Sequence, residues 1–225
     1  MKKLILLLLA MLAPALTCHA ETTREELVAR VESCEAILQD FQARQKTAVP
    51  PAVWQRARAL IILNQFKAGF LLGVQEGYGV IMVKKADGRW SLPVLISAGE
   101  TSLGFQIGAT AVESVFVITD DATPRMLFNR RFNVGVDAKA VIGPKAAEAE
   151  RVNEELLRTP MLAYVKSAGV YAGATVKAGR IARNDKANFN LYNTRYTMPE
   201  LLYSDWVQPP AEVQPLMAMV QRLAP

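Results

Sequence analysis

Histidine and cysteine are scarce in this sequence, and its N-terminal apolar run is short. The 225 residues include one histidine, His19, and two cysteines, Cys18 and Cys34. Two cysteines cannot build a disulfide-dense scaffold or a four-thiolate zinc site. The apolar run from Leu4 to Ala13 covers about ten residues, whereas a membrane-spanning helix needs about twenty. With 51% hydrophobic and 21% charged residues, the composition is that of an ordinary folded domain.

The first twenty residues have the pattern of a secretory signal peptide. A lysine pair at positions 2 and 3 precedes the apolar run, and the small residue Ala20 closes the segment. This pattern predicts cleavage after Ala20 and a periplasmic or secreted protein. The alternative is a lipoprotein anchored to a membrane through Cys18, although the branched Thr17 just before it fits that alternative poorly.

Cleavage would remove residues that many catalytic sites need. The mature chain would keep one cysteine, Cys34, and no histidine. This excludes Ser-His-Asp and Cys-His nucleophile systems, histidine-containing zinc sites and an intrachain disulfide. The net charge would fall from +5 to +3 with the loss of two lysines, which is too small to indicate nucleic-acid binding. We therefore expect no metal, no cofactor and no nucleic-acid partner.

Other catalytic motifs are incomplete. The segment 99–106 has the glycine spacing of a phosphate-binding loop, but Phe105 stands where that loop needs lysine. Four acidic residues lie near glycine turns: Glu76, Asp87, Glu100 and Asp137. They leave open a carboxylate pair acting on a sugar. Because Asp87 is explained by its turn, we rank a hydrolase third and predict that the protein is not an enzyme.

A helix with one apolar stripe is predicted over 22–46. Thr23 and Glu26 have the spacing of a capping box. The stripe recurs at 4-3-4-3 spacing: Leu27, Val31, Cys34, Leu38 and Phe41. It would pack on the rest of the chain or on a protein partner, and Cys34 would be a small buried side chain. The opposite face mixes both charges, unlike a helix that binds anionic membranes.

The rest of the chain mixes helical patterns with glycine-punctuated strands. We predict a helix at 52–64, a hairpin of strands 80–85 and 90–97 around Asp87-Gly88, and a second hairpin of strands 102–110 and 113–119. We expect Trp54 and Trp90 in the core. The remaining expected elements are strands at 131–136, 140–142 and 161–176, and helices at 146–157, 185–193, 199–203 and 211–223.

These elements predict an α+β fold. Its sheet would be antiparallel and twisted, either open or barrel-like, and flanked by N- and C-terminal helices. The predicted organisation is a signal peptide at 1–20, an amphipathic helix at 21–50, the main domain at 51–205 and a C-terminal helix at 206–225.

Glycine-containing motifs follow one another through the main domain. They are KAGFLLGVQEGYGV at 67–80, DGRWSLP at 87–93, GETSLGFQIG at 99–108, GP at 143–144, YVKSAGVYAG at 164–173 and NFNLY at 188–192. In this order they resemble the SYLF domain family, over roughly residues 51–203. Each motif alone is weak, but the ordered set is specific.

The resemblance implies a lipid-binding α+β domain. It also implies phosphoinositide ligands for eukaryotic members, a role in actin binding for yeast members, and export for bacterial members. An exported bacterial member, as the signal peptide predicts here, would meet neither actin nor cytosolic phosphoinositides. We therefore expect a phospholipid or membrane-surface partner and no actin partner.

The candidate lipid site rests on cations beside the glycine-rich segments. Lys67 lies in the first of them, and Lys177, Arg180 and Arg183 follow the last. A headgroup phosphate needs cations, and acyl chains need apolar surface. We predict that these four residues hold the headgroup and an apolar groove holds the chains, in a non-enzymatic phospholipid-binding protein of the cell envelope.

Two alternatives remain open at this point. The charges that flank the first hairpin tip, Lys84, Lys85 and Arg89, are a second candidate for membrane contact, although hairpin tips are commonly charged. The alternative function is a structural or interaction protein of the envelope that uses the helix at 22–46 as its partner surface.

Overall fold

A computed structural model describes residues 22–70, 72–103, 108–126, 131–134, 140–167 and 179–225. For strand residues 67–70, 72–75, 100–103, 108–110, 131 and 167, only the backbone is described. The predicted signal peptide, with both of its processing alternatives, lies outside the described residues, as does Lys177.

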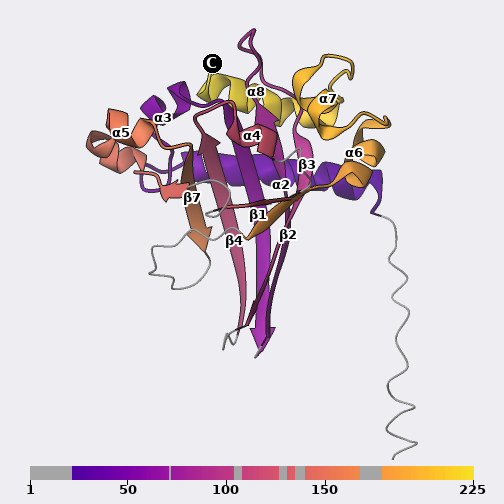
Figure 1. Ribbon diagram of the computed structural model, residues 1–225, viewed down its shortest axis with the longest axis horizontal. Helices are drawn as coiled ribbons and strands as arrows, with labels where there is room; N and C mark the ends of the chain where they lie inside the picture. The colour runs from indigo at the N-terminus through magenta and orange to yellow at the C-terminus, as the bar shows by residue number, and fades with distance from the viewer. Residues whose placement is uncertain (1–21, 71, 104–107, 127–130, 135–139, 168–178) are drawn as a thin grey trace, which may run out of the picture.

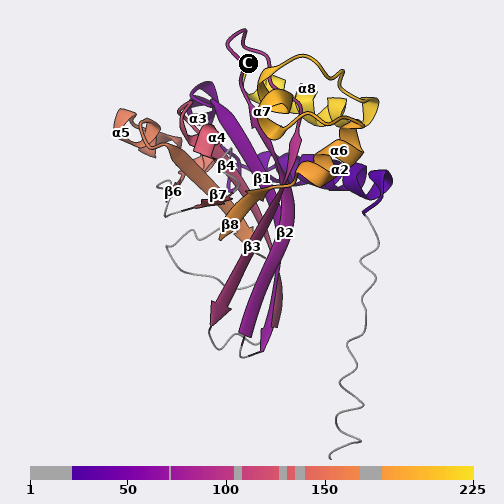
Figure 2. The ribbon, with the colours of Figure 1, turned by 45° about the vertical axis from the view of Figure 1, so that its right-hand side comes forward.

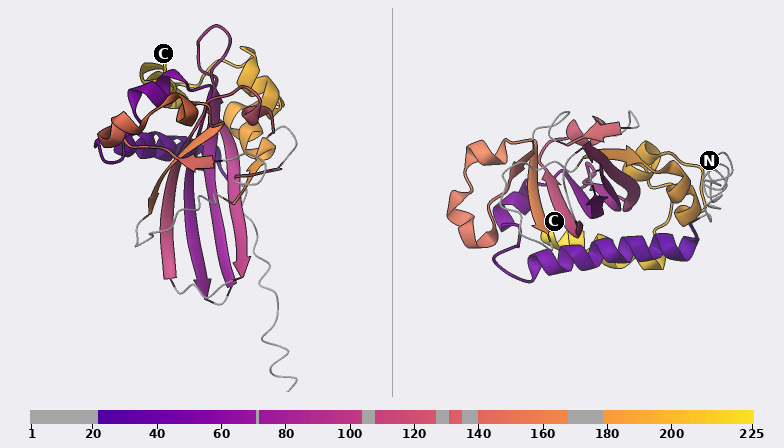
Figure 3. Two further views of the ribbon diagram at one scale, coloured as in Figure 1. Left: turned by 60° about the vertical axis from the view of Figure 1, so that its left-hand side comes forward. Right: turned by 90° about the horizontal axis from the view of Figure 1, so that it is seen from below.

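One eight-stranded sheet forms the centre of the fold (Figure 1). Its spatial order is β5-β8-β3-β2-β1-β4-β7-β6. The strands are β1 Ala59–Phe70, β2 Leu72–Val83, β3 Val94–Leu103, β4 Gly108–Ile118, β5 Arg131–Asn133, β6 Ala140–Ile142, β7 Met161–Ser167 and β8 Arg180–Arg183. All neighbours are antiparallel except β6 and β7, which are parallel. The sheet curls into a half-barrel (Figure 3), which confirms the predicted α+β class.

Helices cover the body of the sheet. The longest, α2 (Arg24–Gln42), crosses one face almost at right angles to the strands (Figures 1 and 2). The others are α3 Pro51–Gln55, α4 Thr123–Met126, α5 Glu154–Leu157, α6 Asp185–Tyr192, α7 Met198–Tyr203 and α8 Gln214–Leu223, with 3-10 turns η2 Ala146–Arg151 and η3 Ala211–Val213. In the described ranges, no helix is both long enough and apolar enough to cross a bilayer.

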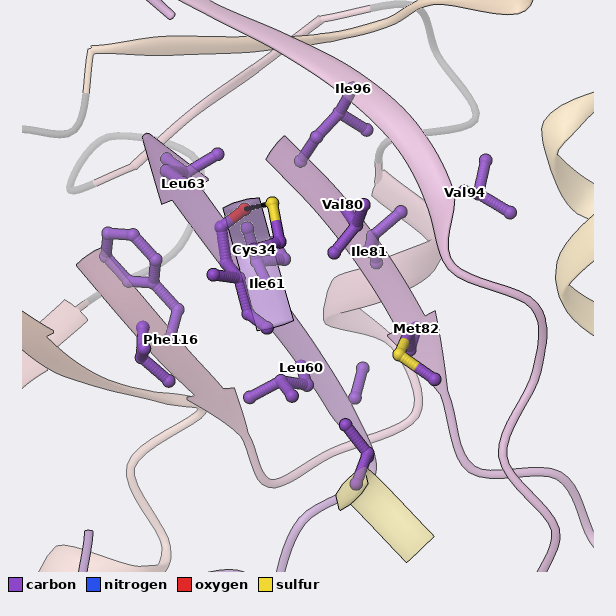
Figure 4. Close-up of a cluster of buried hydrophobic side chains, with 14 of the residues drawn as sticks. Cys34, Leu60, Ile61, Leu63, Val80, Ile81, Met82, Val94, Ile96 and Phe116 are labelled. Carbon is purple, nitrogen blue, oxygen red and sulfur yellow. Dashed lines mark hydrogen bonds between the residues drawn. The ribbon is translucent and has the colours of Figure 1, made fainter. Parts of the chain in front are cut away.

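The sequence of α2 explains both its start and its packing. Thr23 Oγ1 accepts a hydrogen bond from the backbone N–H of Glu26 at 3.2 Å, and the Glu26 carboxylate accepts one from the Thr23 N–H at 3.1 Å. This is the predicted capping box. The apolar stripe is buried against the sheet, and the Cys34 Sγ lies 3.9 Å from the Ile62 carbonyl oxygen (Figure 4).

The burial of this stripe corrects the partner hypothesis for residues 22–46. Leu27, Val31 and Leu38 are each 0% exposed within the chain itself. An apolar side chain that is already covered contributes nothing to a second interface. Only the mixed-charge face of α2 remains exposed, so the stripe is a core element. Trp54 and Trp90 are also buried, as expected.

The helix predicted at 52–64 is wrong beyond its first turns. α3 ends at Gln55, and β1 begins at Ala59. The run from Leu60 to Leu63 is fully buried, because β1 is a central strand that is covered on both faces. A short, continuous apolar run fits a buried strand as well as a buried helix, so periodicity alone does not separate the two.

The second predicted hairpin, at 102–119, is also wrong. β3 pairs with β2 and β8, whereas β4 pairs with β1 and β7. The hairpin of β1 and β2 therefore lies between them, in the strand order of a Greek key. Strands that are close in the sequence often pair, which is why a hairpin was predicted here. In the structure, β2 and β4 instead pair with the two edges of the apolar strand β1 and bury it in the middle of the sheet.

Two glycines allow β2 to approach β1 closely. A Cβ atom at Gly79 would lie 2.1 Å from the Ile62 carbonyl oxygen, and one at Gly77 would lie 2.4 Å from that of Asn64. Neither position has room for a side chain next to fixed backbone atoms. These glycines of the 67–80 motif therefore have a structural role in the central pair of strands.

Candidate functional site

The four longest strands continue beyond the helices as a projecting ribbon (Figure 3). We define the distal ribbon as residues 66–70, 72–76, 99–103 and 108–111 of β1 to β4. On the face that α2 crosses, Asn64 is half-buried against α2, whereas Phe66, two residues further along β1, is 55% exposed. The outer strands β8 and β7 pair only with 96–99 and 112–118. In the described residues, the ribbon is thus a four-stranded sheet with two open edges.

The strand register divides the ribbon into an apolar and a polar face. The Asn64 side chain contacts Ser33 of α2, so Phe66, two residues further along, lies on the α2 side of the sheet. By the pairing of the strands, the positions on this face are Phe66, Ala68, Phe70, Leu72, Val74, Glu76, Gly99, Thr101, Leu103, Ala109 and Ala111. The opposite positions are Lys67, Gly69, Gly73, Gln75, Glu100, Ser102, Gly108 and Thr110.

A polar cluster lies at the root of the apolar face, where α2 crosses the strands. The Asn64 Nδ2 donates to Ser33 Oγ and to the Tyr78 hydroxyl, each at 3.1 Å. The Tyr78 hydroxyl donates to Ser33 Oγ at 3.2 Å. The Arg30 guanidinium carbon lies 5.2 Å from the Tyr78 ring centroid, within the range of a cation–π contact. We call Arg30, Ser33, Asn64 and Tyr78 the root cluster.

Two of the predicted cations lie at the level of this root. The strand register pairs Arg180 with Gly99 of β3, Gly99 with Glu76 of β2, and Glu76 with Phe66 of β1. These four residues therefore form one row across the sheet. The backbone of Lys67 lies one residue further along β1, at a position on the other face. β1 and β8 are three strand spacings apart, or about 14 Å. The structure therefore places Lys67 and Arg180 at one level without bringing them into one pocket.

The other two predicted cations are placed differently. Arg183 lies three residues nearer the body than Arg180, and its Nη2 is 2.8 Å from the Asp185 Oδ2. Its side chain is 17% exposed, so this ion pair leaves it less available than Arg180, which is exposed. Lys177 is outside the described residues, and its role stays a prediction.

Two of the hairpin charges, Lys85 and Arg89, line a pocket at the opposite end of the body. Its volume is about 320 Å³, and its walls include Trp90, Met217 and Asp205. Both Lys85 and Arg89 form ion pairs with the Asp205 carboxylate, and these hydrogen bonds hold the pKa of Asp205 below its usual range. Lys85 and Arg89 are thus already paired within the chain.

Phe66 and Arg30 are the site residues that sequence reasoning missed. Phe66, Ala68 and Phe70 alternate with polar or glycine positions, which is the period of a strand with one apolar face. This alternation begins directly after the helix predicted at 52–64, in a segment that was interpreted through its glycines, and no strand was predicted from it. No sequence pattern points to Arg30, because its place depends on α2 crossing β2. In the ranges described, no group of acidic, histidine or cysteine side chains is arranged to bind a metal.

Comparison with known proteins gives the family. The model of the Ysc84 family, described as "Las17-binding protein actin regulator", matches residues 99–223, which is more than half of the chain. The chain belongs to the Ysc84 family. This confirms the resemblance to the SYLF domain family, which is the same family.

Two relatives show how far the similarity extends. LAS seventeen-binding protein 3 of Saccharomyces cerevisiae is 31% identical over 179 residues, which cover 78% of this chain and 39% of the relative. SH3 domain-containing YSC84-like protein 1 of Homo sapiens is 25% identical over 162 residues, 72% of this chain and 47% of the relative. The matched part of the chain thus spans 39% and 47% of the length of these two relatives.

Proposed function

We propose that this Ysc84 family protein binds phospholipid without catalysing a reaction, with the acyl chains along the apolar face of the distal ribbon. The observation that carries the proposal is the amphipathic register of the ribbon, whose apolar face begins at the exposed Phe66. Arg180 lies at this starting level, at a position on the same face, and Lys67 lies one residue further along β1, at a position on the other face. A cation beside an apolar face is the arrangement that a phospholipid requires.

The dimensions of the ribbon suit the outer part of a membrane. From Phe66 to Phe70 the strand advances about 13 Å, which exceeds the thickness of one headgroup layer. The outer edges at 100–103 and 108–111 lack a described partner strand. Unpaired backbone groups are costly in hydrocarbon. We therefore propose contact with the chains at the membrane interface and no spanning of the bilayer.

The proposed setting is the cell envelope, either in the periplasm or outside the cell. It depends on the predicted signal peptide, or on the alternative lipid anchor at Cys18. In that setting actin would not be a partner, whatever the family description says of other members. The relatives named above carry SH3 or Las17-binding names, and these names are consistent with a family of binding modules.

Flotation with vesicles tests the proposal. We expect the protein to float with phosphatidylcholine vesicles at low salt, and Phe66→Ser to weaken the affinity about tenfold, because a buried phenylalanine contributes about 1.5 to 3 kcal/mol. The matched control is Trp206→Ser. Trp206 is 63% exposed and follows α7, at the end of the body away from the ribbon (Figure 1). Absence of flotation with every phospholipid at low salt would overturn the proposal.

A further inference from the structure

The root cluster has hydrogen-bond donors that the described residues do not use. Ser33 Oγ accepts from both Asn64 and Tyr78, and it donates no hydrogen bond to another of the described residues. The Arg30 guanidinium carbon lies over the Tyr78 ring, 5.2 Å from its centroid, and Arg30 has no ion pair in the described part of the chain. A cation–π contact does not use the N–H groups of a guanidinium as hydrogen-bond donors, so they remain available to an acceptor. The cluster thus combines a free hydroxyl donor with available guanidinium N–H groups.

Asn64 and Tyr78 fix the geometry of these donors. The Asn64 Nδ2 donates to both Ser33 and Tyr78, and the Tyr78 hydroxyl donates to the same Ser33 oxygen. The two strand residues face each other directly in the register of β1 and β2. Donors held by a rigid sheet are preorganised, so that they lose little entropy when an acceptor binds.

We propose that the root cluster binds the phosphodiester of a phospholipid headgroup, through the Arg30 guanidinium and the Ser33 hydroxyl. This inference rests on the proposed function, because it assigns the headgroup to the root of the face that takes the chains. Guanidinium and hydroxyl donors are the groups that recognise phosphate oxygens. Phe66 lies next to the cluster on the same face, which is where the chains of such a lipid would begin.

The neighbouring charges narrow the class of headgroup. Glu76 is exposed on the same face, two residues from Tyr78 along β2 and in the row of Arg180. A carboxylate next to the phosphate site repels headgroups with additional negative charges, and it attracts a quaternary or primary ammonium. The inferred ligand is therefore a zwitterionic phospholipid such as phosphatidylcholine or phosphatidylethanolamine.

Vesicles with and without phosphate test the inference. Phosphatidylcholine and digalactosyl diacylglycerol carry similar chains, but only the first has a phosphodiester. We expect Arg30→Gln to reduce the affinity for phosphatidylcholine vesicles about fivefold and to leave the affinity for galactolipid vesicles unchanged. Ser33→Ala and Tyr78→Phe should shift affinity in the same direction by a smaller factor, because each removes a hydroxyl and keeps the charge.

A charge-matched variant serves as the control. Arg222→Gln removes the same charge from an exposed position in α8, at the end of the molecule away from the ribbon (Figure 1), and should leave both affinities unchanged. If Arg30→Gln and Arg222→Gln behave alike on phosphatidylcholine, the inference is overturned while the proposed function stands. If Arg30→Gln weakens binding to both lipids equally, the phosphate assignment is likewise overturned.

A soluble headgroup separates a lipid from a free phosphodiester. Titration of the protein with glycerophosphocholine, followed by NMR of the Arg30 and Tyr78 side chains, reports on the cluster without a membrane. Shifts that Arg30→Gln abolishes support the phosphodiester site even if no vesicle floats, and the source is then a soluble phosphodiester. Absence of these shifts, together with vesicle binding that is insensitive to Arg30→Gln, would overturn the inference.

Discussion

Gln65 and Phe66 are consecutive residues of β1, yet Gln65 is 1% exposed and Phe66 is 55% exposed. Gln65 lies on the sheet face opposite α2, which is still covered at this level, whereas Phe66 lies on the α2 face just beyond the helix. A phenylalanine in the middle of a sheet is normally covered by a second layer. Here α2 crosses the strands just before this position and covers nothing beyond it. The exposed Phe66, at the start of this row of apolar positions, is the feature on which the proposed function depends.

Charges at the two ends of the molecule should affect lipid binding differently. We expect Lys67→Gln and Arg180→Gln each to weaken phosphatidylcholine binding several-fold, because both lie at the ribbon root. The double variant Lys85→Gln, Arg89→Gln should have no effect, since both side chains are paired with Asp205. Flotation affinities measure this. A larger loss from the hairpin pair than from the ribbon cations would assign the membrane contact to the hairpin.

Replacement of Gly79 should destabilise the fold itself. Gly79→Ala places a Cβ atom against the Ile62 carbonyl oxygen, and we expect a loss of about 3 kcal/mol in the free energy of unfolding. Gly88→Ala is the control, since its Cβ would meet no atom within 4 Å and only its φ of +82° is unfavourable, at about 1 kcal/mol. Urea denaturation compares them. Equal losses would contradict the close approach of β1 and β2.

Whether a feature of this fold can be predicted from the sequence depends on how many distant residues determine it. Local signals were sufficient for the capping box of α2, the Asp87-Gly88 turn and the buried Cys34, because each depends on a few neighbouring residues. Whether residues 60–63 form a strand or a helix, and which strands pair with β3 and β4, depends on the whole sheet. The apolar face of the ribbon could be predicted only in part. Its alternation of apolar residues is visible in the sequence, but the exposure of Phe66 depends on where α2 crosses the sheet.

The residues of the candidate site likewise include some that the sequence predicts and some that it does not. Lys67 and Arg180 were predicted from their position beside glycine-rich segments, and the sheet register later gave them a common level. Arg30 lies more than thirty residues before this segment, and only the crossing of α2 over β2 brings it to Tyr78. Contacts of this kind between distant segments have no signal in a single sequence.

Asn188 should be a major contributor to the attachment of α6. This residue is fully buried, and its amide accepts from the Leu95 N–H at 2.7 Å and donates to the Leu95 carbonyl at 2.9 Å. Asn188→Ala leaves buried backbone groups without partners, and we expect a loss of about 3 kcal/mol. Asn190→Ala, in the same helix, should cost much less. Chemical denaturation of both variants checks this, and similar losses would contradict the role of Asn188.

Cys34 should make stability depend on alkaline pH. Burial raises the pKa of this thiol to about 12 from a value near 9.0. Its neutral form is therefore favoured by folding, and this contribution is present below pH 9 and is lost as the pH rises towards 12. The slope reaches about 1.4 kcal/mol per pH unit.

Cys34→Ala provides the comparison for this prediction. The unfolding free energy of the natural chain should fall more steeply between pH 9 and 10 than that of the variant, before buried tyrosines begin to contribute. Urea denaturation at closely spaced pH values gives both slopes. Identical slopes, or rapid labelling of the native thiol at pH 8, would contradict the burial of Cys34.

The contact between the ribbon face and acyl chains has a direct spectroscopic test. Phe66→Trp, in a Trp206→Phe background, places an exposed indole on the apolar face while Trp54 and Trp90 remain buried. On addition of phosphatidylcholine vesicles we predict a blue shift in the emission of the introduced indole and its quenching by lipids brominated on the acyl chains. Vesicle flotation without either spectral change would show that the protein binds lipid by another surface.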